Sequence, residues 1–202
     1  RAGSPVLSCR WMAARRRYRD VPGVPQVFDR LAVRHHRDRA APRLEAYDFL
    51  LREVADRLGD CLLDIKRDFP MALDLGCHGG QLASVLAGRG GIEELVQCDL
   101  SPAMLGQAEG IRLAVDEEVL PFADGQFDLI ISNLSLHWVN DLPGAFSQIR
   151  RALKPDGLFL CAMLGGGTLD ELRQSLMAGE IAAKGGASPR VSPFVDPHDA
   201  GA

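Results

Sequence analysis

Three acidic side chains stand where successive buried strands are expected to end. Asp74 precedes Gly76 by two residues, Asp99 lies 19 residues after Gly80, and Asp116 closes the next apolar segment. At the carboxyl edge of a parallel sheet, one carboxylate can accept hydrogen bonds from both hydroxyls of a ribose, and another can accept one from an adenine amino group. The spacing therefore predicts a nucleoside site with Asp99 at the ribose and Asp116 at the base.

The glycine loop that follows Asp74 narrows the class of ligand. Its glycines lie at positions 76, 79 and 80, between an expected strand and an expected helix, where a ligand can approach the backbone and the free N–H groups of the helix start. This spacing differs from the GxGxxG of dinucleotide sites, and a phosphate loop of the form GxxxxGKS or GxxxxGKT is absent. An acid before the first glycine favours a zwitterionic cofactor that carries an amino group.

These residues need a sheet that brings them to one edge. Strands are expected at 71–75, 94–99, 111–115, 127–132 and 158–163, with helices at about 81–87, 102–108 and 143–154. Ser101 before Pro102 predicts the cap of the second of these helices. The turn Lys154-Pro-Asp-Gly157 is expected to use Gly157 as the residue that tolerates positive φ. Alternating strands and helices predict an α/β fold with a Rossmann-like, doubly wound, mostly parallel sheet.

Two further helices flank this alternating region. Apolar residues at helical spacing predict an amphipathic helix over 42–58, with Gly59 as its C-terminal stop. Thr168-Leu-Asp-Glu171 has the pattern of a capping box and predicts a helix that runs to Lys184.

Four runs resemble class I S-adenosylmethionine (SAM) dependent methyltransferases of the small-molecule "type 11" group, over about residues 71–164. They are Ala-Leu-Asp-Leu-Gly-Cys, Cys-Asp-Leu-Ser-Pro-Ala-Met-Leu, Leu-Pro-Phe followed by Phe-Asp-Leu-Ile-Ile-Ser-Asn, and Leu-His-Trp-Val-Asn-Asp. The resemblance implies the class I methyltransferase fold and SAM as cofactor. It implies these site residues: Asp74, Gly76 and Gly80 at the methionine end, Asp99 at the ribose, Asp116 and Glu117 at the adenine edge, and Ser132 and Asn133 on the methyl-donor side.

His78 departs from the family pattern, which usually has glycine at this position. A β-carbon there restricts φ, and an imidazole can crowd the cofactor. We expect a loop histidine that faces solvent, with weakened SAM affinity as the alternative. Cys77 beside it has no third or fourth ligand nearby in the sequence, so no metal site is predicted.

Longer stretches resemble a narrower family, the complex I assembly factor 5 proteins of mitochondria and alphaproteobacteria, over about residues 27–199. The stretches that carry this resemblance are Val27–Arg30, Phe69–Gly76, Asp116–Phe122, Ser132–Pro143, Gly166–Leu176 and Ser188–Phe194. The mitochondrial member of that family is credited with arginine hydroxylation on an iron–sulfur subunit of NADH dehydrogenase. The methyltransferase fold and the hydroxylation credited to this family therefore imply different reactions.

Three functions stay open at this point. The first is SAM-dependent methyl transfer to a small-molecule or protein acceptor. The second is a complex I assembly role with protein arginine hydroxylation, and the third is a SAM-binding module without turnover. Methyl transfer needs chiefly in-line positioning, so no catalytic residue is assigned. His137 and Trp138 are the acceptor-side candidates, and the alternative for Trp138 is packing under the following helix.

Composition and charge limit the partners and the membrane association that can be expected. Residues 1–43 carry 11 Arg and 3 Asp, whereas 44–202 carry 12 basic and 24 acidic residues. We expect a basic arm at 1–41, either disordered or targeting, whose residues 1–24 are a mitochondrial presequence or upstream read-through. The arm has no recognisable binding module, so no nucleic-acid partner is predicted. No apolar run approaches the roughly 20 residues of a transmembrane helix.

The cysteine pattern predicts the cellular compartment, and the strand count predicts that part of the sheet is missing. Five cysteines without CxxC spacing indicate a reducing compartment, either a bacterial cytoplasm or the mitochondrial matrix. Class I methyltransferases have seven strands, and residues 185–202 offer no run suited to a hairpin. We therefore expect a SAM-binding domain at 42–202 that is truncated at its C-terminus, with the apolar strand 158–163 left as a sheet edge prone to self-association.

Overall fold

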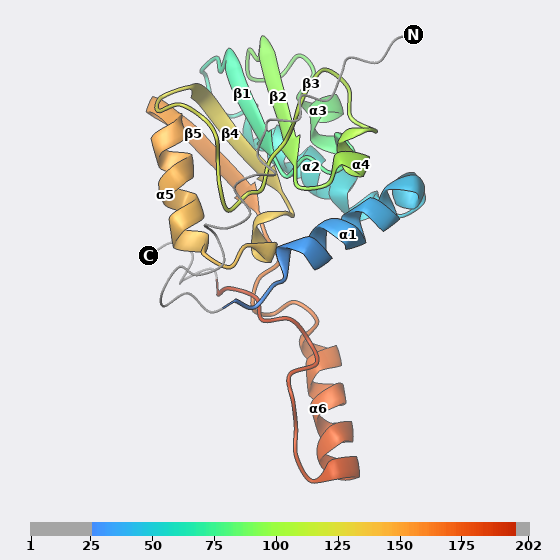
Figure 1. The fold of residues 1–202 in the computed structure, drawn as a ribbon. Helices are drawn as coiled ribbons and strands as arrows, with labels where there is room; N and C mark the ends of the chain where they lie inside the picture. The colour runs from blue at the N-terminus through green and yellow to red at the C-terminus, as the bar shows by residue number, and fades with distance from the viewer. Residues whose placement is uncertain (1–25, 197–202) are drawn as a thin grey trace. The chain divides into compact units, whose positions relative to one another are not determined.

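The computed structural model describes residues 26–196, and its centre is a five-stranded sheet (Figure 1). The strands are β1 (Met71–Leu75), β2 (Glu94–Asp99), β3 (Ile111–Ala114), β4 (Phe127–Asn133) and β5 (Leu153–Ala162). Every neighbouring pair in the sheet is parallel, and the spatial order is β3-β2-β1-β4-β5. The expected α/β class with a parallel sheet is confirmed.

The strand order creates the place where a ligand site belongs. The chain builds outward from β1 through β2 to β3, and then crosses back to lay β4 on the other side of β1. In open α/β sheets, ligands bind beyond the carboxyl ends of the strands at such a reversal. The ends of β1, β2 and β4 therefore face one common region.

Helices cover both faces of the sheet. In chain order, the helical elements of residues 26–196 are α1 (Arg30–Ala40), the 3-10 helix η2 (Ala41–Ala46), α2 (Phe49–Cys61), α3 (Gln81–Leu86), α4 (Pro102–Leu105), the 3-10 helix η3 (Leu136–Trp138), α5 (Leu142–Ala152) and α6 (Asp170–Lys184). Of these, α6 belongs to a separate compact unit. Side chains of α2 and α3 form a buried core with Ala72, Leu129 and Ile131 of the sheet. Phe159 of β5 meets Phe146 of α5 with ring centroids 5.7 Å apart. Because side chains alternate between the two faces of a sheet along each strand, α5 covers the face opposite to the one that α2 and α3 cover.

The limits predicted for the amphipathic helix over residues 42–58 are wrong. The chain forms η2, breaks at Tyr47, and only then forms α2, so the side chain of Tyr47 is 72% exposed. Gly59 does not end the helix, which runs on to Cys61. A β-carbon at Gly59 would lie 2.5 Å from Cγ1 of Val85, so glycine is required here by the close approach of α2 and α3.

Two local turn predictions are also wrong. α6 begins at Asp170 with no side-chain cap, and Leu169 before it has a φ of 56°, so Thr168 is not a cap. The turn expected at Lys154–Gly157 is instead an irregular part of β5, which begins at Leu153 and not at residue 158 as expected. There Asp156 has the positive φ, 61°, in place of Gly157. A β-carbon at Gly157 would lie 2.9 Å from the Lys154 carbonyl oxygen, which explains the glycine by space and not by φ.

The contacts divide the chain after Ala162 into two compact units. The first holds the sheet and the elements from α1 to α5, and the second holds α6, which ends with Gly185 in the left-handed conformation. Between residues 26 and 196, no helix is long and apolar enough to cross a membrane. The expectations for residues 1–24 lie outside the described residues, and the proposed domain limits stay a prediction.

Candidate functional site

The loop after β1 is folded tightly against the neighbouring strand ends. The amides of Gly76 and Cys77 both donate to the Cys98 carbonyl, at 2.8 and 2.9 Å. Gly76 has a φ of 78°, and a β-carbon there would lie 2.1 Å from the Ser135 hydroxyl oxygen. Gly80 has a φ of 86°. Glycine at 76 is thus required both by conformation and by the close approach of the segment after β4.

Asp74 is the fourth residue of β1 and is fully buried next to this loop. Its side chain is 0% exposed, and neither carboxyl oxygen has a hydrogen-bond partner among the described residues. Burial raises the pKa of Asp74 well above its usual range, and the charge of Asp99 raises it further. A buried carboxyl group without a partner is costly, and a ligand with an amino group would supply the missing donors.

Asp99 ends β2 and is also fully buried. Its Oδ1 accepts a hydrogen bond from the Ser101 amide at 2.7 Å, and its Oδ2 accepts one from the His78 amide at 3.1 Å. Nη1 of Arg37 lies 3.1 Å from both oxygens. Ser101 in turn caps α4 by accepting from the Met104 amide at 3.1 Å, which confirms the expected cap.

Glu117 and Asp116 follow β3 and form the second acidic part of the site. Glu117 is 0% exposed and accepts from the Ser135 hydroxyl at 2.6 Å and from Nη1 of Arg37 at 2.8 Å. Burial raises the pKa of Glu117, but the guanidinium groups of Arg37 and Arg30 outweigh this effect and hold it well below its usual range. Arg30 also pairs with Asp116, with Nη2 2.7 Å from Oδ1.

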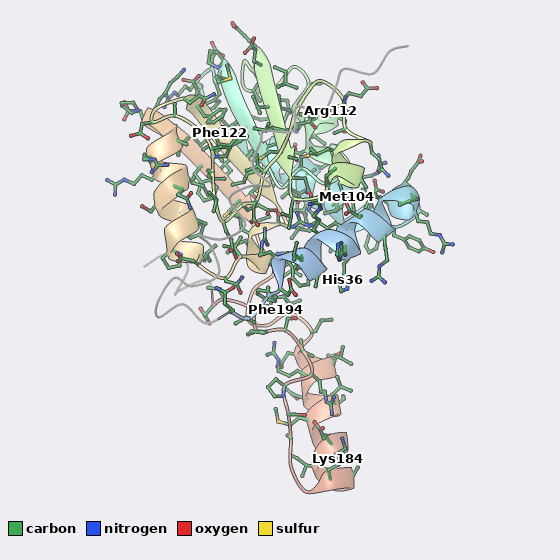
Figure 2. The ribbon with its side chains drawn as sticks, in the orientation of Figure 1. His36, Met104, Arg112, Phe122, Lys184 and Phe194 are labelled. Carbon is green, nitrogen blue, oxygen red and sulfur yellow. The ribbon has the colours of Figure 1, made fainter. Side chains whose placement is uncertain are left out.

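Arg30 and Arg37 are site residues that the sequence reasoning missed. Both lie in the segment expected to be a basic arm, yet α1 is a helix that carries them along the carboxyl edge of the sheet (Figure 1). Arg37 is only 7% exposed, whereas His36 lies on the outer side of α1 (Figure 2). The available signal was their seven-residue spacing, which places two arginines on one helix face opposite several acids.

The expectation that His78 faces solvent is wrong. Its side chain is 9% exposed, its φ is 52°, and its Nε2 lies 3.0 Å from the Asn133 carbonyl oxygen. A carbonyl can only accept, so Nε2 carries the ring proton. Burial lowers the pKa of His78, the positive charge of Arg37 lowers it further, and the imidazole is neutral at pH 7. The Asn133 carbonyl at the end of β4 is thus the hydrogen-bond acceptor that holds the imidazole of His78 inside the site.

Ser132 and Asn133 lie at the end of β4 beside this histidine. The Ser132 hydroxyl donates to the Leu75 carbonyl at 2.7 Å, and Nδ2 of Asn133 donates to the Leu51 carbonyl at 2.8 Å. Oδ1 of Asn133 is buried without a hydrogen-bond partner in the described part of the chain. Ser132 therefore ties β4 to β1, and Asn133 keeps an acceptor at the site.

His137 and Trp138 lie in η3, directly after this strand end. Burial and the charge of Arg37 lower the pKa of His137 to about 4. The Trp138 ring meets Phe28 edge to face at 5.3 Å, and its carbonyl accepts from Nη1 of Arg30 at 2.9 Å. Trp138 thus packs against the segment that leads into α1. Within residues 26–196, no three His, Cys, Asp or Glu side chains are grouped as a metal site.

Comparisons with known proteins agree with this geometry. Residues 73–161 match the family described as "Methyltransferase domain". The chain is 44% identical over 187 residues to the mitochondrial arginine-hydroxylase NDUFAF5 of Homo sapiens, covering 89% of this chain and 54% of the relative. It is 37% identical over 188 residues to the malonyl-[acyl-carrier protein] O-methyltransferase of Halorhodospira halophila, covering 89% and 62%. The chain thus spans about half the length of the NDUFAF5 relatives.

Solved structures show the same fold. A putative methyltransferase of Haloferax volcanii, solved with its Trm112 activator, superposes with a TM-score of 0.58 at 26% identity, over 65% of this chain and 60% of that one. A SAM-dependent methyltransferase of Thermotoga maritima gives a TM-score of 0.58 at 19% identity, over 82% and 75%. The chain has the class I methyltransferase fold, its residues 73–161 match a methyltransferase domain, and it is similar to the NDUFAF5 arginine hydroxylases.

Proposed function

We propose that this chain is the SAM-binding part of a SAM-dependent methyltransferase that acts on a small-molecule or protein acceptor. The observation that carries the proposal is the carboxyl group of Asp74, fully buried and without a hydrogen-bond partner within residues 26–196. It lies at the glycine loop, where an amino group of a ligand would satisfy it. The match to the methyltransferase domain over residues 73–161 supports the same assignment.

The residues present fit this cofactor. Asp74 with Gly76 and Gly80 would hold the methionine end, Asp99 the ribose, Asp116 and Glu117 the adenine edge, and Ser132 and Asn133 the methyl-donor side. When bound, SAM supplies an electrophilic methyl group on a sulfonium centre. The protein's own task is then to exclude water and to align the acceptor, and a base is needed only if the acceptor must lose a proton.

The acceptor side is proposed at His137 and Trp138. The pKa of about 4 keeps the imidazole of His137 neutral at pH 7, so it can exchange hydrogen bonds with an acceptor without adding charge beside Arg37. The indole of Trp138 is partly exposed and offers an apolar wall. The acceptor itself is either a small molecule or a protein.

A second candidate is protein arginine hydroxylation in the assembly of respiratory complex I. It is favoured by sequence identity: the NDUFAF5 relatives are 43% and 44% identical to this chain, against 37% for the malonyl-[acyl-carrier protein] O-methyltransferase. On this reading the acceptor is a complex I subunit and the location is the mitochondrial matrix, and the NDUFAF5 relatives are mitochondrial proteins. A bacterial cytoplasm is the location that goes with the first reading.

One experiment separates the candidates. The chain is incubated with SAM carrying a labelled methyl group and with a lysate fraction or an arginine-containing peptide, and the products are analysed by mass spectrometry. Transfer of the labelled methyl group supports the first proposal, and addition of an oxygen atom to arginine supports the second. SAM binding without any product supports a binding module without turnover. Asp99→Ala serves as the control that should remove cofactor-dependent products.

A further inference from the structure

The hydrogen-bonding capacity of Asp99 is already filled within the protein. A carboxylate offers about four acceptor sites, two on each oxygen. Oδ1 accepts from the Ser101 amide at 2.7 Å and from Nη1 of Arg37 at 3.1 Å. Oδ2 accepts from the His78 amide and from Nη1 of Arg37, both at 3.1 Å. Two ribose hydroxyls could therefore bond to Asp99 only if one set of these donors leaves.

The two sets of donors differ in how firmly they are fixed. The amides of Ser101 and His78 belong to the backbone of the α4 cap and of the glycine loop, so they hold Asp99 in place with or without a ligand. Arg37 reaches Asp99 from a different element, at the far end of a flexible side chain. The guanidinium of Arg37 is thus the exchangeable partner.

The attachment of α1 to the sheet is mainly polar, which makes such an exchange accessible. Only Val33 and Arg37 are buried on α1. Several ion pairs and hydrogen bonds hold α1 in place: Arg37 also pairs with Glu117 and Ser135, Arg30 pairs with Asp116 and Glu117, and Asp38 accepts from the Ser101 hydroxyl. A buried ion pair adds little net stability, because desolvation offsets the attraction, but it separates easily only if both charges find other partners. Ribose hydroxyls would supply donors to Asp99, and Arg30 would remain paired with Glu117.

We propose that Arg37 is an internal competitor for the cofactor site: its guanidinium occupies the ribose position on Asp99, and a nucleoside cofactor binds only by displacing it. This inference rests on the proposed role of Asp99 in SAM binding. The measured affinity is then the intrinsic affinity reduced by the fraction of molecules in which Arg37 has left Asp99. α1 accordingly regulates access to the site.

The test compares two substitutions on the same helix. Arg37→Met keeps an unbranched stem of the side chain and removes the guanidinium donors, and Arg39→Met makes the same change at an exposed position. Binding of S-adenosylhomocysteine and of adenosine is measured by calorimetry. We expect Arg37→Met to bind both ligands at least about fivefold more tightly than the wild type, and Arg39→Met to bind them equally well. Unchanged or weaker binding by folded Arg37→Met overturns the proposal.

A measurement on the wild type covers the case in which Arg37→Met does not fold. Hydrogen–deuterium exchange is followed in peptides over residues 30–40, with and without saturating S-adenosylhomocysteine. Faster exchange with the ligand supports displacement of Arg37, whereas slower or unchanged exchange overturns it. If neither the wild type nor folded Arg37→Met binds either ligand, the proposed cofactor function falls as well. If both bind with equal affinity, only the competition by Arg37 falls.

Discussion

Asp74 has the most unusual electrostatic environment among the acids of the site. Burial and the neighbouring charge of Asp99 both raise its pKa, and the thiol of Cys77 packs nearby without adding a donor to it. The raised pKa favours the protonated carboxyl group in the free protein. Pairing with the amino group of a cofactor requires the ionised form, so binding must release this proton.

We therefore predict that SAM binding releases a proton from Asp74 and that the affinity rises with pH while the amino group of the ligand stays charged. At pH 6 the amino group of the ligand is already charged, since α-amino groups have pKa values of about 7.7–8.0. Calorimetric titrations in two buffers with different heats of ionisation measure the release. Asp74→Asn should remove it and weaken binding by about tenfold. Binding by the wild type without proton exchange would contradict the prediction.

The two buried histidines predict how stability depends on pH. Burial first, and the charge of Arg37 second, lower the pKa of His78 and lower that of His137 from 6.5 to about 4. The unfolded chain therefore binds more protons than the folded one between these values. The contribution to stability is complete above pH 6.5 and is lost as the pH falls towards 4.

Urea unfolding at a series of pH values tests this expectation. Between pH 7 and pH 4.5 the midpoint should fall less, or rise more, for His137→Gln than for the wild type, because the opposite contribution of Asp74, whose pKa is raised, is the same in both proteins. His36→Gln, at an exposed position on α1, is the matched control and should retain the full slope. Equal slopes for the wild type and His137→Gln would show that His137 is not the group involved.

Single residues also show where sequence reasoning reaches its limit. Asp74 and Asp99 could be placed because each lies near the carboxyl end of a short strand, and parallel strands bring their carboxyl ends together. Arg37 could not, because its pairing depends on how α1 docks across a sheet whose acids lie 62 and 80 residues further along the chain. The inward turn of His78 likewise depends on a carbonyl 55 residues away.

Among the elements, α1 begins at a side-chain cap that the sequence analysis did not predict. Asp29 accepts hydrogen bonds from the amides of Leu31 and Ala32, at 2.9 and 3.2 Å. Removal of such a cap costs about 1 kcal/mol of helix stability. We predict that Asp29→Ala speeds hydrogen–deuterium exchange in residues 30–40 and leaves the strands unaffected. Asp64→Ala, in an exposed position outside α1, is the control, and equal exchange in both variants would refute the role of the cap.

Strands were predicted more closely than helices. β1 and β2 were placed at their observed limits, because buried parallel strands read as short apolar runs between turn residues. The helix before β1 was misplaced, because its apolar spacing runs smoothly through Tyr47, where the backbone actually breaks between η2 and α2. The periodicity of apolar residues alone does not reveal this break in the backbone.

At the scale of the whole molecule, β5 lies at the end of the sheet order and, in the described part of the chain, pairs only with β4. An apolar strand with a free edge favours pairing with another chain. We predict that this 202-residue chain self-associates as its concentration rises, as measured by sedimentation velocity. A single monomeric species across the concentration range would count against the prediction.

The most direct test of the cofactor site is a calorimetric titration of SAM into three proteins: the wild type, Asp99→Ala, and Asp124→Ala as a control acid in an exposed ion pair with Arg151. The loss of the ribose acceptor costs about 1–3 kcal/mol. We predict that the wild type binds SAM, that Asp99→Ala binds it roughly tenfold or more weakly, and that Asp124→Ala matches the wild type. A folded wild type that does not bind SAM, or a folded Asp99→Ala with unchanged affinity, would contradict the assignment of the site.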